Sequence, residues 1–187
     1  FVTNDQKRKQ PLVVAVDTSL SMTGEKLAIT AVALAVVLLQ FADDPVGMIA
    51  FENEAKVIKK PNEKVDLMRI VERFLDVPAR GYTHLEDALR ASLKMVSEMP
   101  LVGVYRPVST LLITDGKYTA GKDPAYLASR FKHLSVVKMG SEQSSLPLCS
   151  ELAQKGRGFL REASELEKLP RVMYSAIKDL LRGQSIR

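Results

Sequence analysis

Few residues of the kinds that build disulfides, zinc cages and aromatic binding platforms are present in this sequence. Its 187 residues include one cysteine, Cys149, two histidines, His84 and His133, and no tryptophan. A single cysteine excludes an internal disulfide and a cysteine-based zinc site. Aromatic residues amount to only 6%, and they do not alternate with basic residues, which argues against base stacking on nucleic acid.

Apolar segments long enough to cross a membrane are absent as well. The most apolar stretch, residues 27–42, is interrupted by Thr30 and Gln40 and falls short of the ~20 apolar residues that a membrane span requires. We expect it to be a helix that is buried on nearly all sides and packs against a sheet. Residues 1–10 are polar and do not resemble a signal peptide, so we expect a cytoplasmic protein without a membrane span.

The overall composition is that of a folded globular domain. Hydrophobic residues make up 46% and charged residues 26% of the chain, which is enough apolar material to bury a sizeable core. We expect a polar lead-in at residues 1–10 and a single domain at residues 11–183. The 27 basic and 22 acidic residues leave a net charge of +5, which permits contact with nucleic acid or a membrane surface without requiring it.

Short apolar runs alternate with segments of helical periodicity along the chain. The runs predict strands, and apolar residues that recur every three or four positions predict helices. Strands are expected at residues 12–16, 46–51, 55–59, 108–114, 134–139 and 156–162. Helices are expected at residues 25–42, 65–74, 83–99, 124–133, 146–155 and 170–181. This alternation predicts a three-layer, doubly wound, Rossmann-like α/β fold, whose mostly parallel six-stranded sheet has one antiparallel edge strand and helices on both faces.

Carboxylates and hydroxyls follow the carboxyl ends of the expected strands. Asp17, Ser19 and Ser21 come directly after the first strand. Thr83 opens a helix, and Asp115 follows a later strand. Because ligands of such sheets bind beyond the carboxyl ends of the strands, we expect these side chains to converge on one rim. All of them offer hard oxygen ligands, which suit Mg²⁺ or Mn²⁺ and not zinc.

Each of these residues also has a purely structural interpretation. Ser19 and Ser21 are typical turn and helix-cap residues. Thr83 has the spacing of a capping box with Glu86, and Asp115 with the following glycine has the pattern of a turn. Taken singly, the structural interpretation is favoured, whereas the gathering of all five residues at one end of one sheet favours a metal site.

The set resembles the metal-ion-dependent adhesion site (MIDAS) of von Willebrand factor A domains. That site combines a DxSxS motif after the first strand, a threonine at the start of a middle helix and Asp-Gly after the central strand. The likeness extends from about residue 11 to residue 183. It implies that Ser19 and Ser21 bind the metal directly, that Thr83 does so in a ligand-ready form, and that Asp17 and Asp115 act largely through bound water.

Within that family, the sequence resembles prokaryotic members. Residues 46–51 (VGMIAF), residues 112–116 (LITDG) and the tail at residues 151–170 are similar to magnesium-chelatase D subunits and to CoxE-like proteins encoded beside MoxR-type AAA+ ATPases. The resemblance implies a non-catalytic domain whose Mg²⁺ ion, replaceable by Mn²⁺ in vitro, docks an Asp or Glu of a partner. That partner is expected to be the AAA+ ATPase or its substrate. Those relatives carry the domain at the C-terminus of longer chains, so a start at Phe1 rather than Met is expected of an excised piece.

Two other functions compete with docking. The first is a metal-dependent nuclease or other phosphoryl-transfer enzyme, in which Asp17, Asp87 and Asp115 would surround Mg²⁺ or Mn²⁺, although the serine hydroxyls fit two-metal catalysis poorly. The second is a nucleic-acid scaffold, which is less favoured. It would use a basic face formed by Lys117, Lys122, Arg130 and Lys132. A serine hydrolase and a nucleotide-binding enzyme are disfavoured, since the sequence contains neither a GxSxG elbow nor a Walker A or GxGxxG loop.

Overall fold

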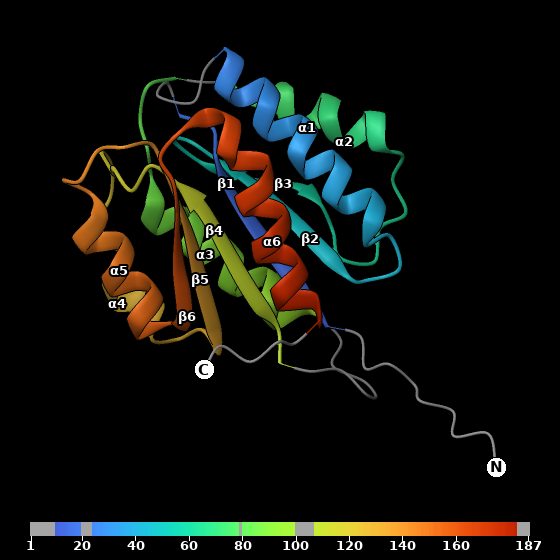
Figure 1. The fold of residues 1–187 in the computed structure, drawn as a ribbon. Coiled ribbons are helices and arrows are strands. Elements are labelled where there is room, and N and C mark those ends of the chain that lie inside the picture. The colour runs from blue at the N-terminus through green and yellow to red at the C-terminus, as the bar shows by residue number, and fades with distance from the viewer. Residues whose placement is uncertain (1–9, 20–23, 79, 100–106, 183–187) are drawn as a thin grey trace.

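The computed structural model describes residues 10–19, 24–78, 80–99 and 107–182. These residues form a six-stranded sheet of order β3-β2-β1-β4-β5-β6, in which β3 is antiparallel to β2 and every other neighbouring pair is parallel (Figure 1). The strands are β1 (Leu12–Asp17), β2 (Val46–Phe51), β3 (Ala55–Lys59), β4 (Ser109–Thr114), β5 (His133–Met139) and β6 (Arg157–Ala163). The predicted fold class and its antiparallel edge strand are confirmed.

Helices cover both faces of the sheet. The helices are α1 (Glu25–Gln40), α2 (Leu67–Leu75), α3 (Leu85–Glu98), α4 (Ala125–Ala128), α5 (Leu146–Lys155) and α6 (Leu169–Arg182), the last preceded by a 3₁₀ turn at Leu166–Lys168. The helices α1, α2 and α6 pack on one face, and α3, α4 and α5 pack on the other. Among the described residues, no helix combines the length and apolarity needed to cross a membrane.

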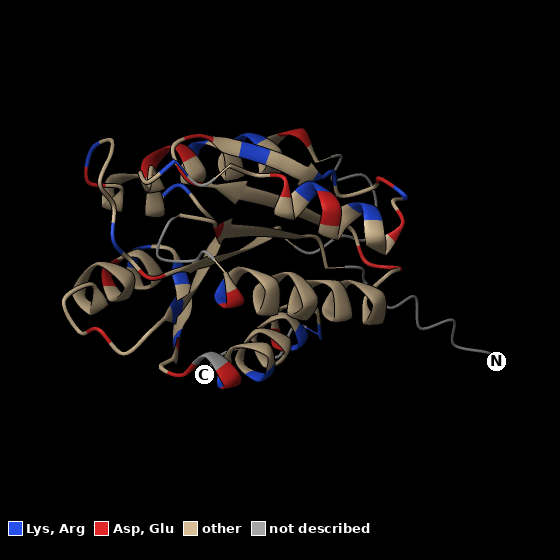
Figure 2. Ribbon diagram, turned by 90° about the horizontal axis from the view of Figure 1, so that it is seen from above, with Lys and Arg blue, Asp and Glu red and all other residues tan. Residues whose placement is uncertain are grey.

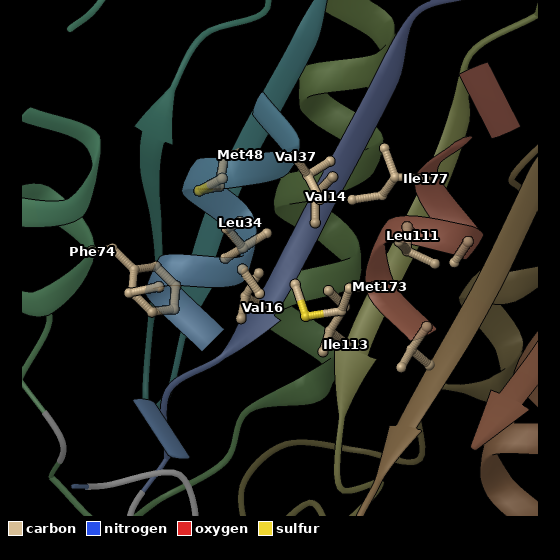
Figure 3. Close-up of a cluster of buried hydrophobic side chains, with 14 of the residues drawn as sticks. Val14, Val16, Leu34, Val37, Met48, Phe74, Leu111, Ile113, Met173 and Ile177 are labelled. Carbon is tan, nitrogen blue, oxygen red and sulfur yellow. The ribbon is translucent and has the colours of Figure 1, made fainter. Parts of the chain in front are cut away.

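Two cores form because successive strand residues point to opposite faces of the sheet. Val14 and Val16 of β1 face α1 and α6, where they meet side chains such as Leu34 and Met173 (Figure 3). Val13 and Ala15 of the same strand face the opposite core, built with α3 and α5. The central strands are therefore buried on both sides, which explains why they read as continuous apolar runs.

The predicted helix at residues 124–133 is wrong in its length. The structure has a single turn at Ala125–Ala128 and then two tight turns, in which the amides of Arg130 and Phe131 donate to carbonyls three residues earlier. The Phe131 side chain is buried. The backbone carbonyl of Phe131 accepts a hydrogen bond of 3.0 Å from the guanidinium of Arg157, which begins β6. Burial of Phe131 and its bond to a distant strand outweigh the local helical pattern, so His133 already lies in β5.

The apolar helix α1 is less buried than its sequence predicts. Its inner side packs in the core, but Val32, Val36 and Leu39 are exposed by 60%, 47% and 59%. The expectation of burial on nearly all sides is therefore wrong for one side of the helix. The reason is its position as the middle helix of an outer layer, with α2 and α6 beside it and nothing described above it.

Candidate metal centre

The candidate site lies where the strand order reverses at the centre of the sheet. From β1 the chain crosses to β2 on one side, whereas β4 pairs with β1 on the other side, with Val16 opposite Ile113. Asp17 ends β1 and Asp115 follows β4 directly. A crevice at such a switch point is where open α/β sheets bind ligands, so the fold itself brings the two predicted aspartates to one place.

Asp17 is a fully buried carboxylate held by short hydrogen bonds. Its Oδ1 accepts the Ser19 backbone amide at 2.9 Å, and its Oδ2 accepts the Thr114 hydroxyl at 2.8 Å. Burial raises the pKa of Asp17 to about 6, and the negative charge of Asp115 adds to this, whereas the hydrogen bonds from Ser19 and Thr114 oppose it. A nearby cation would favour the charged form that burial disfavours.

The loop after β1 begins in a fixed position. Both the amide and the hydroxyl of Thr18 donate to the carbonyl of Phe51, at 2.8 and 3.1 Å, which ties the loop to the end of β2. Ser19 is buried, and its side chain also hydrogen-bonds to Asp17. The second serine of the motif, Ser21, lies outside the described residues.

Thr83 is buried at the same rim and is clamped through its backbone. Its amide donates to Oγ1 of Thr119 at 2.9 Å, and its carbonyl accepts the amides of Thr119 and Ala120 at 3.0 and 3.2 Å. The Thr83 hydroxyl makes no hydrogen bond to any described residue. The next amide, that of His84, donates to the carbonyl of Glu52 just past β2, at 2.6 Å, which places Thr83 near the carboxyl ends of the strands.

The capping-box interpretation of Thr83 is wrong. Helix α3 begins at Leu85 after a non-helical His84, and no side chain caps it. Glu86 instead accepts hydrogen bonds from the amide of Lys122, at 2.8 Å, and from the hydroxyl of Tyr126. The Thr83 hydroxyl therefore does not act as the cap of α3.

Asp115 sits in a tight turn and is partly exposed. Its Oδ1 accepts the amide of Lys117 at 3.0 Å, so the expected turn does form. The carbonyl of Asp115 accepts the Ser145 hydroxyl at 2.6 Å, which anchors the turn to α5. Gly116 has a φ of +78°, and a Cβ there would lie 2.6 Å from the sulfur of Cys149, so only glycine fits. Among the described residues, the Lys117 amide is the donor seen on the carboxylate of Asp115.

Two residues of the site were not predicted from the sequence. Thr114 holds Asp17, and Thr119 holds Thr83. A signal for Thr114 existed in the sequence, because it ends the predicted strand at residues 108–114, and the carboxyl ends of parallel strands meet at one rim. No comparable signal marked Thr119, whose role depends on how the loop after β4 folds back over α3.

The carboxylate cluster required by the nuclease alternative is not formed. Asp87 turns one carboxylate oxygen to the backbone amide of Ala55, at 2.8 Å. Within the described ranges, no three His, Cys, Asp or Glu side chains are grouped so as to hold a metal ion, and Asp17, Asp87 and Asp115 are all described. The gathering of those three residues that the nuclease alternative needs is therefore not found among the described residues.

The candidate metal ligands are therefore the oxygen atoms of hydroxyl groups and of two aspartates. Asp17, Ser19 and Asp115 meet at the switch point, and Thr83 lies at the same rim. The chemistry of this set fits a hard divalent cation, because such ions prefer oxygen ligands. A buried carboxylate that lacks a positive partner is the expected counterpart of such an ion.

Solved structures share this fold at low sequence identity. The conserved hypothetical protein BatB from Bacteroides thetaiotaomicron is 18% identical with a TM-score of 0.69, over 94% of this chain and 100% of BatB. A von Willebrand factor type A protein from Catenulispora acidiphila is 14% identical with a TM-score of 0.75, over 93% of this chain and 43% of that protein. Proximal thread matrix protein 1 from the mussel byssus, solved with a zinc-occupied MIDAS motif, is 18% identical with a TM-score of 0.71, over 94% of this chain and 48% of that chain.

The sequence itself also matches a known family. No curated protein matches the sequence significantly. The family described as von Willebrand factor type A domain matches residues 12–117, the segment that contains Asp17, Ser19, Thr83 and Asp115. The match covers more than half of the chain, and the structure has the fold of this family. The chain therefore belongs to the von Willebrand factor type A domain family.

Proposed function

We propose that this domain is a non-catalytic docking module that binds a partner through Mg²⁺. Domains of this family commonly mediate metal-dependent protein interactions. The observation that carries the proposal is the fully buried Asp17, held by Ser19 and Thr114 at the switch point beside Asp115. Such a carboxylate is costly to bury unless a positive charge accompanies it.

The residues that would hold the ion are Asp17, Ser19, Ser21, Thr83 and Asp115. By the family resemblance, the three neutral hydroxyls would bind the ion directly, whereas Asp17 and Asp115 would act largely through bound water. The direct ligands would therefore leave much of the charge of a divalent ion uncompensated. Mg²⁺ prefers six oxygen ligands. When bound, the ion would supply an attraction for one more anionic oxygen, which an Asp or Glu of the partner provides.

The partner we propose is a cytoplasmic AAA+ ATPase of the MoxR or magnesium-chelatase type, or the substrate of such a machine. The support is the likeness of residues 46–51 and 112–116 to proteins that work with those ATPases. In the structure, residues 46–51 form β2 and residues 112–116 run from β4 into the site. The partner would be tested by calorimetric titration of a MoxR-type ATPase with the domain, in Mg²⁺ and in chelator. Binding that is equally tight in both would contradict a docked ion.

Two observations support docking over the enzyme and nucleic-acid alternatives. The sole cysteine, Cys149, is buried, and burial raises the pKa of its thiol to about 11, so it is not a nucleophile at neutral pH. Lys117, a member of the expected basic face, forms an ion pair with Glu142, which reduces the charge available to nucleic acid.

The metal site is tested by thermal unfolding in the presence of Mg²⁺ or Mn²⁺. An ion that binds only the native state stabilises it by about 2.7 kcal/mol at a concentration of 100 Kd, so the wild-type midpoint should rise with metal. The double variant Ser19→Ala/Ser21→Ala should not respond. Ser97→Ala, which removes an exposed hydroxyl near the far end of α3, should respond like the wild type.

Two outcomes would contradict the proposal. If the midpoint of thermal unfolding of the wild type is unchanged up to millimolar Mg²⁺ or Mn²⁺, the domain does not bind a metal ion as proposed. Mn²⁺-dependent cleavage of DNA or RNA that is lost in Asp115→Asn would show an enzyme, since a docking module has no turnover.

A further inference from the structure

A small cavity opens beside the candidate metal centre. Its volume is about 300 Å³, and Asp115 forms part of its wall. The other walls come from the carboxyl ends of β5 and β6 and from the first turns of α1 and α6. Because β4, β5 and β6 are neighbours in the sheet (Figure 1), the cavity continues the rim on which the predicted metal ligands lie. We call it the rim pocket, lined by residues 26, 115, 117, 139–142, 163–164 and 169.

The floor of the rim pocket is apolar. Met139 at the end of β5, Ala163 at the end of β6 and Leu169 at the start of α6 all belong to the core under α1 and α6. They are exposed by only 7%, 3% and 2%, so this core reaches the surface through a narrow opening. Pockets with apolar walls and a few polar groups are typical binding sites, and a volume of this size is near their lower limit. The rim pocket therefore suits a single apolar side chain.

The mouth of the rim pocket carries positive charge. Lys117 forms an ion pair with Glu142, so these two charges offset each other. Lys26 lies in the first turn of α1, and Figure 2 shows that the charged positions of this helix are confined to that turn. The positive pole of the helix dipole lies at the same end. Once a divalent ion offsets Asp17 and Asp115, the mouth favours an acidic segment of a partner over a basic one.

We propose that the rim pocket selects the partner by accepting a bulky apolar side chain that neighbours the docked Asp or Glu. This inference rests on the proposed docking function, since one segment of the partner has to reach both places. Asp115 joins the two places, because it is a proposed metal ligand and also a wall of the pocket. The ion attracts any carboxylate, whereas burial of the neighbouring side chain adds affinity only for partners that have one.

Straight-chain carboxylic acids test the rim pocket without a known partner. Acetate offers only a carboxylate, whereas butanoate and hexanoate add an apolar tail. Their binding to the isotope-labelled chain in Mg²⁺ is followed by the chemical shifts of the backbone amides. If the tail enters the pocket, affinity should rise by about four-fold for each added CH₂ group. The amides of Gly140 and Ala163, which lie at the pocket, should then shift with hexanoate.

A pocket-filling variant and a matched control show where the tail binds. Ser164 is exposed and lines the pocket, so Ser164→Trp places a large side chain at its mouth. This variant should bind acetate, butanoate and hexanoate with nearly equal affinity. Ser97→Trp, which makes the same change at an exposed position near the far end of α3, should keep the chain-length dependence of the wild type. Circular dichroism establishes that each variant is folded, and a midpoint that rises with Mg²⁺ establishes that its metal site is intact.

Four results would overturn the inference while leaving metal binding in place. They are equal affinities of acetate and hexanoate for the wild type, no binding of hexanoate by a wild type that responds to Mg²⁺, hexanoate binding that is as tight in chelator as in Mg²⁺, and a chain-length dependence that persists in Ser164→Trp. A wild-type midpoint that does not respond to metal would instead mark failure of the docking function itself.

A random peptide library displayed on phage tests the chemistry of the partner. Peptides that the immobilised chain retains in Mg²⁺ and releases in chelator should contain Asp or Glu at a constant spacing from a bulky apolar residue. Synthetic peptides in which that apolar residue is alanine should bind the wild type at least about ten-fold more weakly. Retained peptides that share only the acidic residue would overturn the rim pocket as a determinant of the partner.

Discussion

At the scale of single residues, two threonines of β4 have opposite surroundings. Thr114 and Thr110 are both fully buried. The Thr114 hydroxyl donates to Asp17 at 2.8 Å and accepts the amide of Gly116 at 3.0 Å. The Thr110 hydroxyl has no hydrogen-bond partner among the described residues. A buried polar group stabilises a protein only when it is paired, so the two positions form a matched test of the site.

Replacing each threonine with valine should change stability in opposite directions. Thr114→Val removes one hydrogen bond from the buried carboxylate of Asp17 and takes away the acceptor of the Gly116 amide, and should lower the free energy of unfolding by about 1–3 kcal/mol. Thr110→Val removes an unpaired hydroxyl and should leave stability unchanged or raise it by about 1 kcal/mol. Urea unfolding monitored by circular dichroism measures both. Equal losses in the two variants would mean that the hydroxyl of Thr114 has no special role at Asp17.

At the scale of elements, Glu86 joins the start of α3 to the loop that holds Thr83. Its carboxylate accepts the amide of Lys122, the hydroxyl of Tyr126 and the guanidinium of Arg90, while Thr119 of the same loop clamps Thr83. The hydrogen bonds from Tyr126, Lys122 and Arg90 lower the pKa of Glu86 to about 2. The position of a proposed metal ligand therefore depends on a carboxylate that is not itself in the site.

The lowered pKa of Glu86 sets a pH dependence of stability. A group whose pKa is lower in the folded state stabilises that state above its unfolded pKa, which is near 4.5, and loses this effect as pH falls towards 2. Glu86→Gln should therefore be less stable than the wild type at pH 7, and the difference should shrink between pH 4.5 and pH 2. Urea midpoints across that range measure the difference.

Glu151→Gln is the control for this experiment. Glu151 forms an exposed pair with Lys155 on α5, and such pairs contribute little to stability. The urea midpoint of Glu151→Gln should equal that of the wild type at every pH. A difference between Glu86→Gln and the wild type that stays constant down to pH 2 would mean that Glu86 acts through its shape and not through its charge.

At the scale of the whole molecule, the two hydrophobic cores share their central strands. The residues of β1 alternate between the core with α1 and α6 and the core with α3 and α5, and β4 does the same through Leu111 and Leu112. Neither core can lose these strands without exposing the other. We therefore propose that residues 11–183 unfold as one cooperative unit.

Cooperative unfolding is tested by comparing two probes. Far-ultraviolet circular dichroism reports the helices and strands, and tyrosine fluorescence reports packing around side chains such as Tyr126 and Tyr174. The sequence has no tryptophan to dominate the signal. The two transitions should coincide in urea. Separate midpoints would mean that the two layers of helices unfold independently.

Much of this molecule was determined by the sequence alone, because the relevant signals are local. The continuous apolar runs of β1 and β4 and the helical periodicity of α3 and α6 predict the elements within a few residues, and their alternation predicts the parallel sheet. Asp17, Ser19 and Asp115 were predicted at one rim because strand ends in such a sheet must meet there.

Only the tertiary structure decided the features that depend on contacts between distant segments. The bond from Thr114 to Asp17 and the clamp of Thr119 on Thr83 join residues many positions apart. The end of α4 follows from the burial of Phe131, and the exposed side of α1 follows from its place in the outer layer. Periodicity shows which residues avoid water, but whether a neighbour covers them is a property of the packed molecule.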